Sequence, residues 1–493
     1  MHAAALQTSH LALGLPAVSV QATERAEVIR AAMLSVVYFG VANLGLFSAY
    51  DAIALVLGLA VIAPGWRPYL LLLTVSVHDA PGQADPSIYA AVGGITLLML
   101  FSVLMNSKLR TASQTSEDRV FTRFVLCGLV LIAYGIGNSW LQQRLLLHEQ
   151  LEDKPYWLLG GLMATMMVCG FLVNRLLLLD PFASVRLRTV CAMILGHILL
   201  ITLLQTVLGP SFGASGRGMA TISELHELMD GGERGMARLT GPFLSPNTLA
   251  MLPCLYLLIY LRACRGHQIS DNFILAFTCV GVTLAVLGGA RSMFGFYLLS
   301  TGILIWTKSP RRAIALGLIA LPCALAVGVP WDDLLRVMRF DDIDSLQSLG
   351  MRGAYWNACL QNLTRDQWLF GSGLSHWPIF LKYYVGYPGS DPHNWVFSMA
   401  GSFGTPGLLF YGLLGYLLLR RGFRGPDRYR AIALCLLVLL LGRDLANVQY
   451  VVNNHAMGCL YWVCIACVFV SQSETLNDLH TMTRHAARSD ACL

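Results

Sequence analysis

A histidine at the edge of an apolar run is the first residue of this sequence that could perform chemistry. His393 follows the segment SDP and opens a long apolar stretch. An imidazole titrates near neutral pH and can take a proton from a hydroxyl group, so His393 is a candidate general base. Asp391 and Asn394 could align it through hydrogen bonds. The simpler alternative is an interfacial histidine that is hydrogen-bonded to one of these two neighbours and has no catalytic role.

Two arginines occupy comparable positions at the starts of apolar runs. Arg238 precedes a Gly-Pro turn in RLTGPFLSPNTLAMLPC, where Pro246 and Asn247 open the next helix with backbone N–H groups that can bind an anion. Arg291, in LGGARSMFGF, lies at a helix N-terminus, where a cation opposes the macrodipole and an anion is expected to compensate. The alternatives are a Pro-Asn pair that only begins a helix and an arginine that reaches lipid phosphates.

Membrane-spanning helices must position these residues. The chain has 493 residues, of which 56% are hydrophobic and 13% charged, with a mean hydropathy of +0.59. Apolar runs near the ~20 residues that cross a bilayer recur along almost the whole chain. We predict an all-α polytopic transmembrane helical bundle with twelve to fourteen spans. The 13 cysteines lie mostly inside these runs and are expected to pack in the core.

Lysine and arginine collect in alternate loops, as short cytoplasmic loops do. They predict both termini in the cytoplasm. The expected domains are a cytoplasmic tail at 1–30, disordered over about its first 25 residues, a transmembrane domain at 31–471 and a cytoplasmic tail at 472–493. Segment 51–78 predicts two short spans or a re-entrant pair. The predicted spans are 31–49, 51–63, 68–78, 88–105, 120–139, 156–178, 187–207, 247–263, 272–288, 292–306, 312–330, 394–419, 429–444 and 455–471.

Two loops on the opposite, outer side are much longer than the rest, at 208–246 and 331–393. Long loops in a compact protein are usually functional or disordered. The stretch SLQSLGMRGAYWNACLQNL in the second loop predicts an amphipathic helix that can lie at the membrane surface. Its expected apolar face is formed by Leu349, Trp356, Leu360 and Leu363. Function is therefore expected on the outer side.

Two permanent cations and one titratable ring on the same side of a membrane suggest a particular chemistry. Arginine pairs with phosphate oxygens through a planar fork of donors and keeps its charge when buried. A pyrophosphate leaving group needs that charge, and an acceptor hydroxyl needs a base. We therefore expect a lipid-linked pyrophosphate as the substrate. No second His or Cys lies at ligand spacing near His393, so no metal is predicted.

Four stretches resemble the ordered motifs of the O-antigen ligase and polymerase superfamily: RLTGPFLSPNTLA, GGARSMFGF, MRGAYWNACLQNLTRDQWLFGSG and HNWVFSMAGSFGTPGLLFYG. The resemblance covers about residues 235–445, and the first half is similar only in being a run of spans. It implies a bacterial inner-membrane glycosyltransferase with a C-type fold, which moves a glycan from undecaprenyl pyrophosphate to a periplasmic acceptor without metal or cofactor. In ligases the acceptor is the lipid A core, and in polymerases it is another lipid-linked glycan.

The resemblance also implies roles for individual residues. Arg238 and Arg291 would hold the pyrophosphate, and His393 would be the general base. Arg352, in the R-x-x-x-W stretch of the long loop, matches a further position that orients sugar or phosphate. Its alternative is the solvated face of an amphipathic helix. The chain departs from the family pattern at Ala290, which leaves Arg291 without the usual preceding serine.

Secondary candidates complete this assignment. Asn247, Asp391 and Asn394 are possible substrate-binding residues. Gly371 and Gly373 match the Gly-x-Gly turn of the family, where only the missing side chains matter.

Three other classes of protein share some of these features. A transporter of lipid-linked sugars would have outer cations, but also charged groups near the bilayer midplane or two related halves, which the sequence lacks. A peptidoglycan polymerase would use a carboxylate, for which Asp391 and Asp444 are the candidates. A purely structural membrane protein gives no reason for Arg291. We favour a glycosyltransferase, and a ligase over a polymerase.

Overall fold

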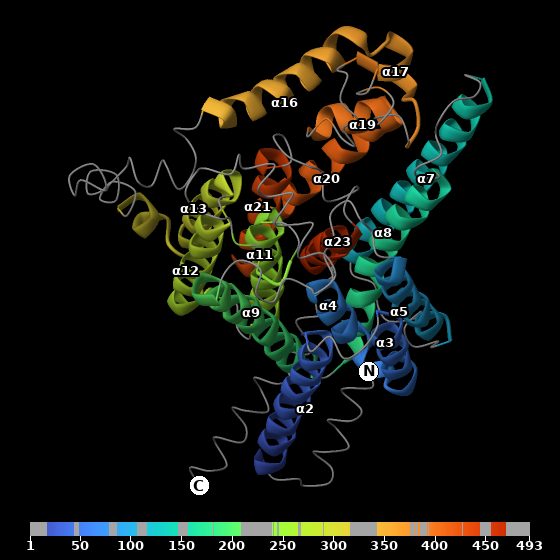
Figure 1. Ribbon diagram of the computed structural model, residues 1–493. Helices are drawn as coiled ribbons and strands as arrows, with labels where there is room; N and C mark the ends of the chain where they lie inside the picture. The colour runs from blue at the N-terminus through green and yellow to red at the C-terminus, as the bar shows by residue number, and fades with distance from the viewer. Residues whose placement is uncertain are drawn as a thin grey trace.

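The computed structural model describes the chain in segments. They are 17–43, 49–77, 86–105, 116–145, 156–180, 182–208, 239, 241–243, 246–264, 268–288, 290–315, 343–374, 380, 383–384, 392, 394–425, 427–443 and 455–469. Within these segments every regular element is a helix and no strand occurs (Figure 1). The predicted all-α fold is confirmed.

The structure describes α-helices and two short helical turns along the chain. In order they are α2 (Ala17–Asn43), α3 (Ala49–Ile62), η1 (Pro64–Trp66), α4 (Arg67–Val77), α5 (Pro86–Met105), α7 (Ser116–Leu145), α8 (Tyr156–Leu179), α9 (Ala183–Leu208), α11 (Pro246–Ala263), α12 (Asp271–Leu287), α13 (Arg291–Lys308), α16 (Ile343–Asn362), α17 (Arg365–Phe370), α19 (Trp395–Phe403), α20 (Thr405–Arg424), α21 (Asp427–Val438), η2 (Leu439–Arg443) and α23 (His455–Phe469).

Several helices are long and apolar enough to cross a membrane. Three satisfy both conditions on their own, namely Asp118–Leu141 in α7, Tyr156–Leu177 in α8 and Ala183–Leu208 in α9. Of the shorter apolar helices, Thr248–Ala263 in α11 packs against α9, and Asp271–Leu287, which is α12, packs against α11. The chain is therefore a polytopic membrane protein, while the total of twelve to fourteen spans stays a prediction.

Residues 51–78 do not form one straight crossing. The helical pair Ala54–Ile62 and Pro64–Ser76 is bent by 115° at its break. Pro64 at the start of η1 explains the break, because proline cannot donate the backbone hydrogen bond that would continue α3. The bend agrees with the predicted choice between two short elements and a re-entrant pair.

The N-terminal prediction is wrong from residue 17 onward. Disorder is expected over about the first 25 residues, but α2 begins at Ala17. The cytoplasmic tail at 1–30 stays a prediction. The Ala, Gln, Glu and Arg residues of α2 favour a helix. Glu27, only 2% exposed, holds Arg186 of α9 at 2.6 Å between charged atoms and ties this segment to the bundle.

The predicted span 394–419 is also wrong as a single helix. The chain breaks at Gly404, which has φ +67° and separates the short α19 from α20. A β-carbon at Gly404 would lie 2.5 Å from the carbonyl oxygen of Leu369, so the neighbouring loop packs directly on this backbone. Pro406 in the first turn of α20 suits a helix start. α19 precedes α20 and packs against it.

Polar contacts join the ends of several helices to the starts or ends of others at one end of the bundle. Lys308 at the end of α13 pairs with Asp271 at the start of α12, with 2.6 Å between their charged atoms. Arg428, near the start of α21, donates to the carbonyl of Cys264, just after α11. Arg421, near the end of α20, donates to the carbonyl of Val468 near the end of α23. We call this the basic end, because it carries many of the predicted cytoplasmic arginines and lysines.

The other ends of the same helices define the opposite end of the bundle. α21 packs along both α13 and α20. At 1.5 Å per residue, the first residue of α13 lies about 27 Å from Lys308, and the first residue of α20 lies about 30 Å from Arg424. The starts of α13 and α20 therefore share the end remote from the basic end. That distance matches the thickness of a bilayer core.

Candidate active site

The start of α13 carries Arg291 and lies beside the turn that follows Arg238. The backbone N–H of Leu239 donates to the carbonyl of Leu287, at 3.1 Å between nitrogen and oxygen. Leu287 ends α12, and α13 starts at Arg291. Two segments that are far apart in the sequence thus meet at one helix start.

No side chain caps the start of α13. Its N-cap is Ala290, which offers no oxygen to the first backbone N–H groups. In contrast, Ser270 caps α12 and Thr364 forms a capping box on α17. An uncapped N-terminus with an arginine at its first position has donors to offer an anion.

The structure describes the predicted site residues to different degrees. Arg238, Asp391 and His393 lie outside the described residues. Asn247, Arg291 and Arg352 belong to α11, α13 and α16, and the structure describes their backbone but not their side chains. Asn394 is described in full. The site must therefore be built from the residues next to these positions.

Asn394 caps α19 directly after His393. It is 6% exposed, and its Oδ1 accepts hydrogen bonds from the backbone N–H groups of Val396 and Phe397, at 2.9 and 3.5 Å. A residue at this position usually satisfies such orphan donors. This role explains the polar residue at the boundary of the apolar run, and it anchors the chain immediately after the histidine.

The residue on the other side of His393 is held by the long loop. The indole Nε1–H of Trp356, on α16, donates to the carbonyl of Pro392 at 3.0 Å. Arg352 lies one turn earlier on α16, and residues four apart share a helix face. The R-x-x-x-W spacing therefore puts position 352 on the same face of α16 as Trp356, which contacts Pro392.

The predicted helix in the long loop is confirmed as α16. Of its expected apolar residues, Trp356 and Leu363, which directly follows the helix, pack in a small cluster with Tyr355, Cys359 and Phe397 of α19. Leu360 is 64% exposed, and its predicted place at the membrane surface stays a prediction.

The Gly-x-Gly turn behaves as predicted. Gly371 and Gly373 have φ of +72° and +92°, conformations that favour glycine. The backbone N–H groups of Ser372 and Gly373 donate to Gly401 and Ser402 at the end of α19, at 2.7 and 3.1 Å. The turn thus ties α17 to α19.

Residues near the end of α7 also hold this turn, and the sequence reasoning missed them. Tyr134 and Asn138 both donate to the carbonyl of Phe370, and Ser139 Oγ accepts from the N–H of Leu374 at 2.7 Å. The spacing of Tyr134 and Asn138 places them on one helix face and was the available signal. Figure 1 shows α7 rising to meet α17 and α19, with α16 lying across the top of the view.

We expect Gly371→Ala to destabilise the protein. A β-carbon there would lie 2.7 Å from backbone atoms of Phe403 and Gly404, and a non-glycine residue at such φ costs about 1–3 kcal/mol. The melting temperature of the purified protein in detergent should fall. Gly353→Ala is the matched control, because its β-carbon would meet nothing within 4 Å and alanine favours a helix interior. Equal melting temperatures for both variants would contradict the expectation.

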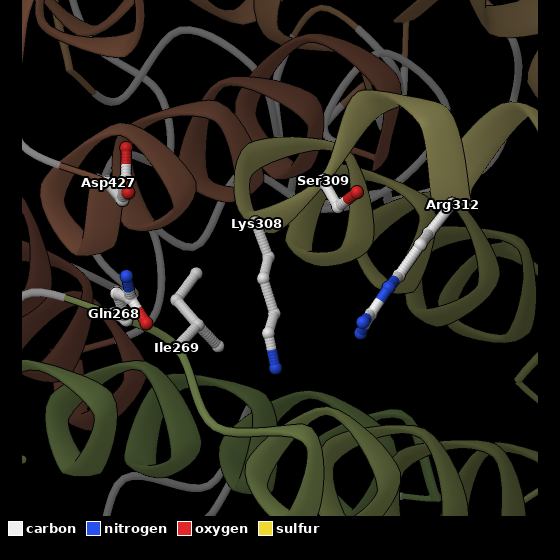
Figure 2. Close-up of a pocket in the computed structure, with 6 residues that line it drawn as sticks. All are labelled: Gln268, Ile269, Lys308, Ser309, Arg312 and Asp427. Carbon is white, nitrogen blue, oxygen red and sulfur yellow. The ribbon is translucent and has the colours of Figure 1, made fainter.

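A cavity of 190 Å³ lies at the basic end of the bundle, away from these segments. Its lining residues are Gln268, Ile269, Lys308, Ser309, Arg312 and Asp427. Figure 2 shows Lys308 and Arg312 extending in the same direction from neighbouring turns. The hydrogen bond from Lys308 lowers the pKa of the Asp271 carboxyl group. About 27 Å of α13 separates Lys308 from Arg291, so this cavity is not part of the candidate site.

The described part of the chain defines a helical, multi-pass membrane protein whose polar segments meet at the end remote from the basic end. Residues 274–412 match the O-antigen ligase family model. This match covers less than a third of the 493 residues and supports membership of the O-antigen ligase and polymerase superfamily, which implies an enzyme of that kind. A search of curated proteins gives no match.

The matched region includes some candidate residues and excludes others. Arg291, Arg352, Asp391, His393 and Asn394 lie inside it. Arg238 and Asn247 lie before it. Their place in the site rests on motif resemblance and on the contact between Leu239 and Leu287.

Proposed function

We propose that this protein transfers an O-antigen or related glycan from undecaprenyl pyrophosphate to an acceptor hydroxyl, with the lipid A core as the acceptor. The observation that carries the proposal is the family match, which contains Arg291 and His393. The fold supports it, because the starts of α13 and α20 share one end of the bundle and α19, which follows His393, precedes α20 directly. Both residues can therefore serve one substrate.

The proposed reaction is a single displacement. The acceptor oxygen attacks the anomeric carbon and forms the new glycosidic bond, while the bond from that carbon to the phosphate oxygen breaks. His393 takes the hydroxyl proton, and undecaprenyl pyrophosphate leaves with the electron pair of the broken bond. Attack opposite the leaving group inverts the anomeric centre. The base and the charge stabilisation of the leaving group each contribute to the rate.

The arginines act on the leaving group in this proposal. Arg291, with the uncapped N–H groups of α13, binds the pyrophosphate, and Arg238 binds it from the neighbouring turn. The hydrogen bond between Leu239 and Leu287 supports a shared ligand, since it brings the two backbones together. Arg352 orients the sugar or phosphate near His393, and the contact between Trp356 and Pro392 supports that place.

The orientation in the membrane follows from the distribution of charge. We propose that the basic end faces the cytoplasm and that the site faces the periplasm of a bacterial inner membrane, with both termini in the cytoplasm. The excess of Arg and Lys at one end supports this orientation. The lipid tail of the donor enters sideways between spans near 247–300, because a substrate anchored in the bilayer cannot arrive from solution.

Deletion of the gene tests this function through a lipopolysaccharide gel. We expect the loss of all O-antigen-capped chains, with the lipid A core left bare, because a ligase is needed for every capping event. Re-expression of the intact gene should restore the capped chains. Survival of core bearing one repeat would identify a polymerase instead. An unchanged ladder would contradict both forms of the proposal.

A further inference from the structure

A buried glutamine in α9 holds the turn that follows Arg238. Gln205 is 1% exposed and lies in a predicted span, three residues before Leu208, the last residue of α9. Its amide Nε2 donates to the carbonyl of Gly241 at 2.7 Å, and its Oε1 accepts from the N–H of Gly241 at 2.8 Å. One side chain thus satisfies both backbone groups of a single residue.

The turn at Gly241 needs such a partner. Gly241 has φ +60° and is buried, so its backbone N–H and C=O groups need partners within the protein. An unsatisfied buried group costs about 1–3 kcal/mol. An amide is the uncharged side chain that carries a donor and an acceptor side by side.

The turn has little room to move. A β-carbon on Gly241 would lie 2.7 Å from Leu249 of α11 and 2.9 Å from the hydroxyl of Thr202 of α9. Thr202 and Gln205 are three residues apart and share a face of α9. Phe243 is 1% exposed, and Leu239 is bonded to Leu287 at the end of α12. Three helices therefore fix one turn.

Stability alone does not require this arrangement. A polar side chain inside a membrane span is expensive and most often marks a functional site. If residue 205 were apolar and the turn were regular and solvated, α9 would cross the membrane equally well. The two hydrogen bonds between Gln205 and Gly241, called the Gln205 clamp below, help to fix the position of the nearby Leu239. Arg238 is the next residue, and consecutive Cα atoms are only 3.8 Å apart.

We infer that Gln205 is a positioning residue, which holds the 239–243 turn against α12 so that Arg238 and Arg291 can bind the same pyrophosphate group. This inference rests on the proposed function and extends it to the part of the chain before the matched region. Gln205 acts through the turn and does not itself touch the substrate. It therefore sets how well the protein distinguishes a pyrophosphate from an uncharged lipid.

Binding of undecaprenyl pyrophosphate to the purified full-length protein tests the inference, with undecaprenol as the uncharged reference lipid. Gln205→Met keeps the length of the side chain and removes both hydrogen bonds. Since small misplacements of binding groups can cost up to about 10²-fold, we expect the Kd for undecaprenyl pyrophosphate to rise roughly 10-fold or more. The Kd for undecaprenol should stay the same.

A buried amide in another span provides the matched control. Asn174 of α8 is 4% exposed and donates to the carbonyls of Gly170 and Val463, far from the turn. Asn174→Leu also removes two buried hydrogen bonds, so it should lower the melting temperature without changing the ratio of the two Kd values. If Gln205→Met does not fold, Gln205→Asn keeps an amide that is one methylene shorter, and a smaller shift in the same direction is expected.

The outcomes separate the two proposals. If Gln205→Met lowers the melting temperature but leaves the ratio of Kd values unchanged, Gln205 only stabilises the fold and the inference is overturned. If the wild-type protein binds undecaprenyl pyrophosphate no better than undecaprenol, the proposed function fails first, whatever the variants do.

Discussion

Replacing His393 with alanine is expected to lower the rate of glycan transfer by roughly 10²-fold or more, the usual loss for a general base. The backbone on both sides of His393 is anchored, by the bond from Trp356 to Pro392 and by the cap at Asn394. The alanine variant should therefore keep its fold while losing the group that accepts the proton. Transfer by purified protein from lipid-linked glycan to lipid A core measures the effect.

His376→Ala is the control for this prediction. His376 belongs to the same long loop and has no counterpart in the family motifs, so we expect near-native transfer. Binding of undecaprenyl pyrophosphate should be retained in both variants, because neither removes a proposed phosphate ligand. Near-native transfer by His393→Ala would remove this residue from the mechanism.

Replacing Arg291 with alanine is expected to lower transfer by about 10²-fold or more, as for other groups that stabilise a developing charge. Arg291 begins α13, whose first N–H groups receive no side-chain cap from Ala290. Loss of the guanidinium removes the permanent cation from this helix start. The same variant should bind undecaprenyl pyrophosphate more weakly, which a titration of the purified protein measures.

Two further variants isolate the contribution of position and shape. Arg312→Ala removes an equal charge near the basic end, by the cavity in Figure 2, and should leave transfer unchanged. Arg291→Lys keeps the charge but loses the planar fork of donors, so only partial activity is expected. Equal loss in the alanine variants of Arg291 and Arg312 would point to net charge rather than a pyrophosphate site.

The sequence by itself determined the helical class of this protein and much of its order along the chain. Apolar runs of the right length predicted the bundle, because backbone groups in lipid must be satisfied within the segment. The spacing of apolar residues in the long loop predicted α16. The two glycines of GSG predicted a turn that other residues cannot adopt, and both have positive φ.

The sequence was misleading about where two helices begin and end. The run 394–419 is mostly apolar, and its length favoured one span although Gly404 and Pro406 are a local signal for a break. What ends α19 is the Gly-x-Gly turn, whose backbone lies against Gly404. Residues 17–30 are polar enough to suggest a tail, and only the pairing of Glu27 with Arg186, 159 positions away, makes them part of the bundle.

Only the tertiary structure decided which segments meet. The bond from Leu374 to Ser139 joins residues 235 positions apart, and the Gln205 clamp on Gly241 spans 36 positions. Helix periodicity reports which face of one segment is apolar, but it carries no information about the partner of a polar side chain. The residue types for the chemistry can therefore be read from the sequence, whereas the residues that hold their backbones in place are chosen by packing between distant helices.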